Sequence, residues 1–200
     1  MDDGPSSLVG RVGPLWTSFP ATVDRVCEPW HRGGVSELNA TAAALLGLLH
    51  EGPMTGGQLV AAARERFGGF FSVTRSQVYR ELPALAEAGL LRLGKQGPRS
   101  SQQYVITAAG KRAFKAWLNT PPEPDPVRSP LILRLVHSGA LTPKQRSRLI
   151  DGAREAYLPL LDELKAKSKA VADDPYAKAA ADFAVAHVRA VIRLLDALPR

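Results

Sequence analysis

The sequence predicts a mainly α-helical protein with a small β-hairpin wing: a winged helix-turn-helix followed by a helical dimerisation domain. Three observations predict it. Apolar residues recur at helical spacing in three successive segments, two strand-like runs joined by a basic, turn-rich segment follow, and a proline-rich stretch then precedes long amphipathic helices. We expect an arm at 1–35, the winged helix-turn-helix at 36–118, a linker at 119–128 and the helical domain at 129–200.

The arm has no sustained apolar period. Residues 1–35 contain four prolines and five glycines, which is typical of flexible chain, although Trp16, Phe19 and Trp30 are unusual in a solvated segment. Two alternatives stay open from the sequence: the working protein begins near Val35, downstream of an early start codon, or the arm docks on the core.

Two helices are indicated at the start of the domain. The first has an apolar face made of Leu38, Ala42, Leu45, Leu46 and Leu49. Ser36 can cap its start, and Gly52-Pro53 stops it. Thr55 can cap the second helix, which ends at Gly68-Gly69.

A third helix opens with Thr74 and Gln77, the spacing of a capping box. Its buried face is predicted to comprise Val78, Leu82, Leu85 and Ala86. Gly89 is placed where a left-handed residue ends a helix, and Pro83 is expected to bend or loosen the helix near Tyr79.

A β-hairpin is predicted after this helix. Its strands are residues 90–93 and 103–106, and the connection between them, 94–101, is rich in turn-forming and basic residues. Thr107 can then cap a fourth helix that reaches Leu118.

The last third of the sequence is predicted to form three helices, which begin at Ser129-Pro130, Thr142-Pro143 and Asp174-Pro175. A kink is expected at Pro159. The two long helices carry apolar stripes formed by Leu149, Ala153, Ala156, Leu160 and Leu164, and by Tyr176, Phe183, Val188, Ile192 and Leu195. Because these stripes are too long to bury in so small a lobe, we expect a homodimer.

The charge favours an anionic partner. The formal net charge is +7 with a pI near 9.9, and residues 36–118 hold 10 basic against 5 acidic side chains. Other classes lack support: Cys27 is the only cysteine, no zinc-ligand spacing or cofactor motif is found, and no membrane span or secretory signal is read. We expect a cytoplasmic protein without enzymatic activity, cofactor or metal.

Three helices followed by a basic hairpin is the order of a winged helix, in which the third helix enters the major groove of double-stranded DNA. The predicted DNA contacts are Arg75, Ser76, Gln77, Tyr79 and Arg80 on the third helix, with Lys95 and Arg99 at the tip of the wing. Arginine pairs with guanine, glutamine with adenine, and tyrosine, serine and lysine with phosphate.

The same residues resemble the PadR family of transcriptional regulators over most of 36–200. The segments that resemble the family are residues 47–49 and 52–56, residues 77–82 and 85–91, residues 104–111 and, to a lesser degree, residues 128–135. Two departures are Pro83 in the third helix and the 35-residue extension, since the family usually begins at its first helix.

This resemblance implies a homodimeric regulator with the longer helical dimerisation domain of one family branch. Such proteins are usually repressors that bind inverted repeats and are released by a small, often aromatic or cationic, molecule. An alternative from a different class is a winged helix that binds another protein without specific DNA binding. A steep salt dependence of duplex binding separates the two hypotheses.

Overall fold

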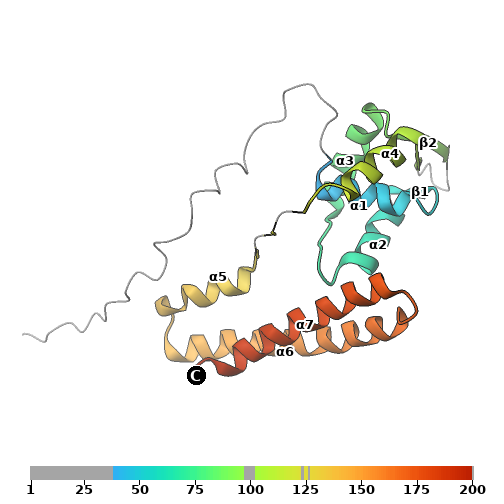
Figure 1. Ribbon diagram of the computed structural model, residues 1–200. Coiled ribbons are helices and arrows are strands. Elements are labelled where there is room, and N and C mark those ends of the chain that lie inside the picture. Colours follow the sequence, from blue (N-terminus) through green and yellow to red (C-terminus); the bar gives the residue numbers. More distant parts are fainter. Residues whose placement is uncertain (1–37, 97–101, 123, 126, 200) are drawn as a thin grey trace, which may run out of the picture. The chain divides into compact units, whose positions relative to one another are not determined.

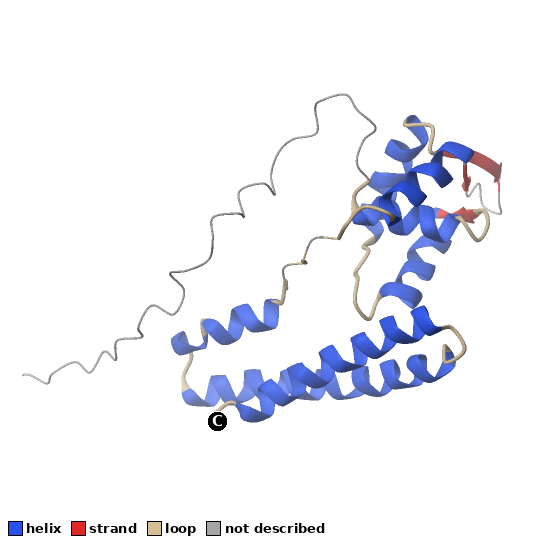
Figure 2. Cartoon of the chain, in the orientation of Figure 1, coloured by secondary structure: helices blue, strands red, loops and turns tan. Residues whose placement is uncertain are grey.

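A computed structural model describes residues 38–96, 102–122, 124, 125 and 127–199, and Figures 1 and 2 show a helical protein with one small sheet. Its elements, in chain order, are α1 (Ala40–Leu49), β1 (Met54–Thr55), α2 (Gly56–Phe67), α3 (Arg75–Glu87), β2 (Leu91–Gln96), β3 (Gln102–Ile106), α4 (Ala108–Leu118), α5 (Pro130–Val136), a 3₁₀ turn η2 (Ser138–Ala140), α6 (Pro143–Ala170) and α7 (Pro175–Ala197). The predicted fold class is confirmed. None of the described helices is both long and apolar enough to cross a lipid bilayer.

Helix starts follow the capping residues, with one correction. The predicted caps that the structure confirms are Thr55, Thr74, Thr107, Ser129, Thr142 and Asp174. The cap predicted at Ser36 is wrong, because α1 begins at Ala40 and the side chain of Asn39 accepts from the backbone N–H of Ala42 at 2.8 Å. Asparagine caps a helix as well as serine does, so the local signal favoured neither residue.

The sheet has three antiparallel strands in the order β1-β3-β2. The predicted hairpin is present as β2 and β3, with Leu91 opposite Ile106. The sequence did not predict β1, in which Met54 pairs with Tyr104, because two residues are too few to display an alternating pattern.

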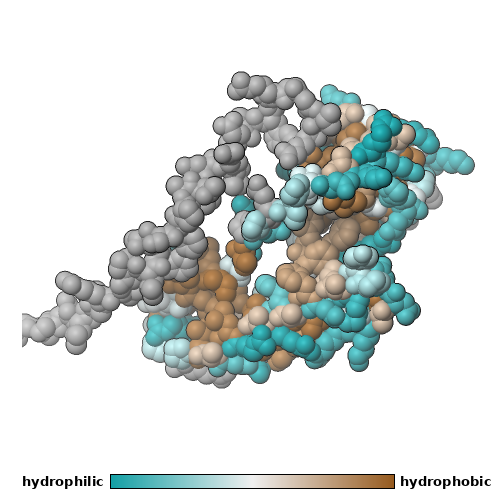
Figure 3. Space-filling view, in the orientation of Figure 1, coloured by the Kyte–Doolittle hydropathy of each residue, from teal (hydrophilic) through white to brown (hydrophobic). Residues whose placement is uncertain are grey.

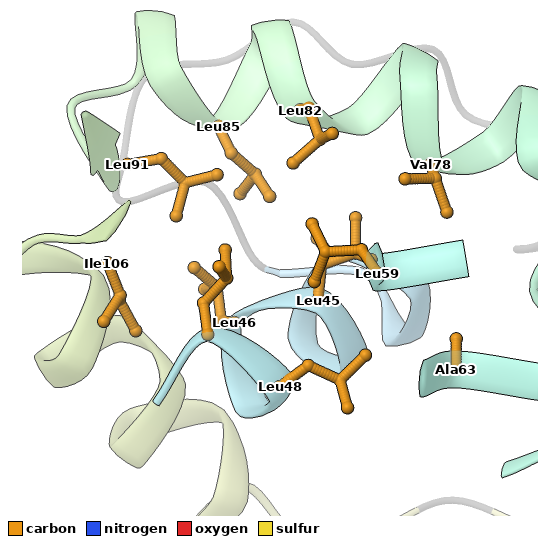
Figure 4. Packing of buried hydrophobic residues seen from close by; sticks show 12 residues of the cluster. Leu45, Leu46, Leu48, Leu59, Ala63, Val78, Leu82, Leu85, Leu91 and Ile106 are labelled. Carbon is orange, nitrogen blue, oxygen red and sulfur yellow. The ribbon is translucent and has the colours of Figure 1, made fainter. Parts of the chain in front are cut away.

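The core of this domain is formed by apolar faces of α1, α2 and α3 together with the ends of β2 and β3 (Figure 4). Leu82 and Leu85 of α3 point toward Leu45 and Leu46 of α1. Each fully buried leucine contributes about 1.5–3 kcal/mol, so this contact fixes which face of α3 turns inward.

The end of α3 is locked to the start of α4. Gly89 has a φ of +70°, as its predicted position past the helix end requires. The hydroxyl of Thr107 donates to the carbonyl oxygens of Gly89, at 2.8 Å, and Leu90, at 3.1 Å. Pro83 lies at an exposed position inside a continuous α3, so the helix is not interrupted there.

The C-terminal helices α6 and α7 form a hairpin with an internal core of its own. Of the predicted stripe residues, four are buried: Leu164, Val188, Ile192 and Leu195. α5 packs against this hairpin through Leu131 and Leu135. The expectation that the whole stripes need a partner is therefore wrong for these four, which the hairpin itself covers.

Polar contacts also join the two long helices. The hydroxyl of Ser168 donates to Oδ1 of Asp182 at 2.7 Å, and Nε of Arg154 donates to Oδ1 of Asp196 at 2.7 Å. The ammonium of Lys178 and then the hydroxyl of Ser168 hold the pKa of Asp182 below its ordinary value.

Two of the predicted stripe residues on α7, Tyr176 and Phe183, are exposed. Tyr176, Phe183, His187 and Leu194 share one side of α7, and we call them the α7 stripe. Tyr176 is 87% exposed and Phe183 63% exposed, and the Phe183 ring stacks with that of His187. Hydrophobic surface also lies over α5 in Figure 3, where Ile132, Leu133 and Val136 are exposed.

Gly110 supplies a stability prediction. A β-carbon at this position would lie 2.2 Å from the carbonyl oxygen of Leu90 and 2.9 Å from Cγ1 of Ile106, so Gly110→Ala should lower the free energy of unfolding by about 2–4 kcal/mol. Gly152→Ala, in α6, meets nothing within 4 Å and should raise it by about 0.5–1 kcal/mol. Urea unfolding followed by circular dichroism measures both, and an unchanged Gly110→Ala variant would contradict the lock between α3 and α4.

Candidate nucleic-acid interface

The exposed face of α3 is polar and basic. Val78, Leu82 and Leu85 are buried against the core, as predicted. The residues left outside in the first two turns include Arg75, Ser76, Tyr79 and Arg80, all of them exposed, with Gln77 half-buried. The structure therefore brings five of the seven predicted contact residues together on one helix.

Two of these five side chains already hold the start of the helix. Oε1 of Gln77 accepts from the backbone N–H of Thr74 at 2.8 Å, closing the predicted capping box. The hydroxyl of Ser76 lies 3.1 Å from that of Thr74. Since the acceptor of Gln77 is engaged, its amide NH₂ is the group left for a base edge.

Arg75 and Tyr79 form a pair one helical turn apart. The guanidinium carbon of Arg75 lies over the ring of Tyr79, 5.4 Å from its centroid, which is within the range of a cation–π contact. The Tyr79 ring also lies close to Gly56 at the start of α2, where an added β-carbon would come within 3.0 Å of it.

Arg80 is positioned by a carboxylate instead. Its Nη2 lies 3.3 Å from Oε1 of Glu81, and the side-chain exposures of the two residues are 72% and 13%. Oε2 of Glu81 in turn accepts from Nδ2 of Asn39 at 3.2 Å. Asn39, the residue that caps α1, thus positions the Glu81 carboxylate, and Glu81 in turn contacts Arg80.

The wing contributes one described residue to the predicted site. Lys95 is exposed on β2, within an irregularity of the pairing between Leu93 and Gln96. Gly94 is packed there, since a β-carbon on it would lie 2.9 Å from Cγ2 of Val105. The predicted contact Arg99 lies outside the described residues.

A pocket lies between the end of α1 and α4. It has a volume of about 410 Å³ and is lined by His50, Lys111, Arg112, Phe114, Lys115 and Leu118. The ring of Phe114 stacks with that of Trp117 and is tilted against that of His50. The lining therefore combines the Phe114 ring with the side chains of Lys111, Arg112 and Lys115. In the part of the chain that the structure describes, no group of three or more acidic, histidine or cysteine side chains could hold a metal ion.

The sequence of residues 45–116 matches a known family, the "Transcriptional regulator PadR-like family". The chain carries a PadR-like domain. Over 110 residues it is 31% identical to the negative transcriptional regulator PadR of Bacillus subtilis (strain 168). That alignment covers 53% of this chain and 60% of the relative, so the chain spans about 60% of the length of the curated protein it matches.

Solved structures agree with the fold of this chain. Bacillus subtilis PadR in complex with operator DNA has a TM-score of 0.64 at 22% identity, covering 78% of this chain and 93% of that one. The same protein in complex with p-coumaric acid has a TM-score of 0.51 at 22% identity, covering 78% and 94%. These likenesses establish the winged-helix fold.

Sequence reasoning missed three residues that support this face: Asn39, Gly56 and Glu81. Glu81 and Asn39 are 42 positions apart, and Gly56 meets Tyr79 from another helix. Only Glu81 carried a signal that could have revealed it, namely a carboxylate next to an arginine on the helix expected to face DNA.

Proposed function

We propose that this chain is a DNA-binding transcriptional regulator: a homodimeric repressor that binds a palindromic operator and is released by a small molecule. One observation carries the proposal. The side of α3 that the core leaves outside presents Arg75, Tyr79 and Arg80 together. On a winged helix this is the face that enters the major groove.

The chemistry of the face supports reading of bases as well as binding to phosphate. A guanidinium donates two parallel hydrogen bonds to guanine, and each such pair discriminates between bases by about 1–3 kcal/mol. Lys95 on the wing supports a contact with the DNA backbone, which adds affinity without sequence preference. Arg99 is proposed for the same role from the sequence alone.

Dimerisation is supported by the α7 stripe. Tyr176, Phe183 and Leu194 are exposed on one side of a helix whose other side already packs on α6, and a second chain is the partner that we propose for them. Two copies related by a twofold axis present two α3 helices, which matches an operator with inverted half-sites about one helical turn apart.

Release by a small molecule is supported by the pocket between α1 and α4. The Phe114 ring in its lining suits a flat ring, and Lys111, Arg112 and Lys115 in the same lining suit a negative group. We therefore propose an aromatic carboxylate as the class of effector. A neighbour of this fold has been solved with p-coumaric acid, which belongs to that class.

The first prediction from the proposed function concerns α3. On an operator selected by the full chain from random duplexes, Arg75→Ala and Arg80→Ala should each weaken binding by about 1–3 kcal/mol, because each removes a base contact. Arg148→Ala, which removes the same charge from an exposed position of α6, is the control and should bind like the wild type. Fluorescence anisotropy measures all three, and unchanged affinity in both α3 variants would remove these residues from the reading face.

The second prediction concerns dimerisation. A chain that ends at Thr120 lacks the α7 stripe, so it should be a monomer and bind the operator far more weakly, since two half-sites are no longer engaged together. Light scattering gives the mass. A fragment that still dimerises would place the interface outside α5, α6 and α7.

The third prediction concerns the effector. Aromatic carboxylates should dissociate the complex with DNA, and the matching amides, which keep the ring and lose the charge, should do so at least about tenfold less well. The change Lys111→Gln with Lys115→Gln should raise the concentration of carboxylate required. Equal release by acid and amide would contradict an anion-binding role for these cations.

A further inference from the structure

Two residues lie close to the Tyr79 ring, Arg75 and Gly56. The guanidinium of Arg75 lies over its ring at 5.4 Å from the centroid. From α2, a β-carbon built on Gly56 would lie 3.0 Å from Cε1 and from Cζ of the ring and 3.1 Å from the hydroxyl oxygen. We call these three residues the Gly56–Tyr79–Arg75 stack.

Helix formation does not by itself explain glycine at position 56. Gly56 and Gly57 are the first two residues of α2, where alanine is the better helix former. A β-carbon on Gly57 would meet only Oγ1 of Thr55, at 4.0 Å, so that position is open. At Gly56 the tyrosine already occupies the space. Of the two glycines, Gly56 alone therefore lies where a β-carbon would displace a neighbouring side chain.

Tyr79 is not buried in the way a core residue is. Its exposure is 46%, so the ring can move aside if a methyl group is placed beneath it. Such a movement costs the fold little. It does change where the ring lies, and Arg75 is held over that ring.

We propose that Gly56 is a specificity-determining positioning residue: it seats the Tyr79 ring, and the seated ring orients the Arg75 guanidinium toward a base edge. This inference rests on the proposed function. Arg80 is oriented through a carboxylate, Glu81, which uses part of its hydrogen-bonding capacity. No carboxylate is paired with Arg75 among the described residues, so an aromatic face holds it and all of its N–H donors stay available for DNA.

The decisive comparison is Gly56→Ala against Gly57→Ala in the full chain. Alanine favours α2 at both positions, and the Tyr79 ring that a methyl group on residue 56 would displace is exposed, so both variants should keep the fold. Gly56→Ala should weaken binding to the selected operator by about three- to tenfold and leave binding to a scrambled duplex unchanged, since orientation of one arginine is lost. Gly57→Ala should bind both duplexes like the wild type. Equal affinities for the two variants, either both intact or both reduced, would overturn the proposal.

A double-variant test identifies the route. If Gly56 acts through the ring, adding Gly56→Ala to a Tyr79→Ala chain should have no further effect on operator affinity. An additional loss of the same three- to tenfold size would mean that Gly56 acts on DNA directly or through the fold, and would overturn the role of the stack.

A measurement without DNA separates this inference from the proposed function. Ring currents of Tyr79 should shift the δ-methylene protons of Arg75 upfield in the NMR spectrum of the free wild type and of Gly57→Ala. The shift should be lost in Gly56→Ala and Tyr79→Ala. Unshifted protons in the wild type would overturn the stack even if the chain binds its operator, whereas shifted protons in a chain that binds no duplex would overturn the proposed function alone.

Discussion

The packing of α3 against α1 is the contact on which the rest of the site depends. Val78, Leu82 and Leu85 are removed from water in one core with Leu45 and Leu46 of α1, so the rotation of α3 about its axis is fixed. The opposite face then carries the arginines and Tyr79 outward. The same hydrophobic contact that stabilises the domain thereby determines which side chains meet a ligand.

The core determines which face of α3 is exposed, and a few contacts outside the core then position the arginine side chains on that face. The core fixes the helix, but long arginine side chains would still sample many rotamers, and ordering them at binding costs free energy. Glu81, held by Asn39, restricts Arg80, and Tyr79, seated on Gly56, restricts Arg75. Each support comes from α1 or α2, so the three helices act together in presenting the face.

Local signals in the sequence predicted the elements well and their mutual contacts poorly. Thr74 with Gln77 predicted the start of α3, and Gly89 predicted its end, because helix caps depend on residues within one turn. Ser36 and Asn39 offered the same local signal, and β1 is too short for any period. The contacts Asn39–Glu81 and Gly56–Tyr79 join separate helices, so no spacing rule contains them. The boundaries proposed for the arm and the linker, and the predicted bends at Pro83 and Pro159, stay predictions.

The most direct test of the account is the salt dependence of duplex binding by the wild-type chain. Anisotropy titrations would compare DNA from upstream of its own gene with an unrelated duplex, at about 50 and 200 mM salt. We predict tighter binding to the upstream DNA, two chains per site, and an affinity that falls at least about tenfold as salt rises, because phosphate contacts release counterions. Absence of binding to either duplex at low salt would contradict DNA recognition and favour a winged helix that binds another protein.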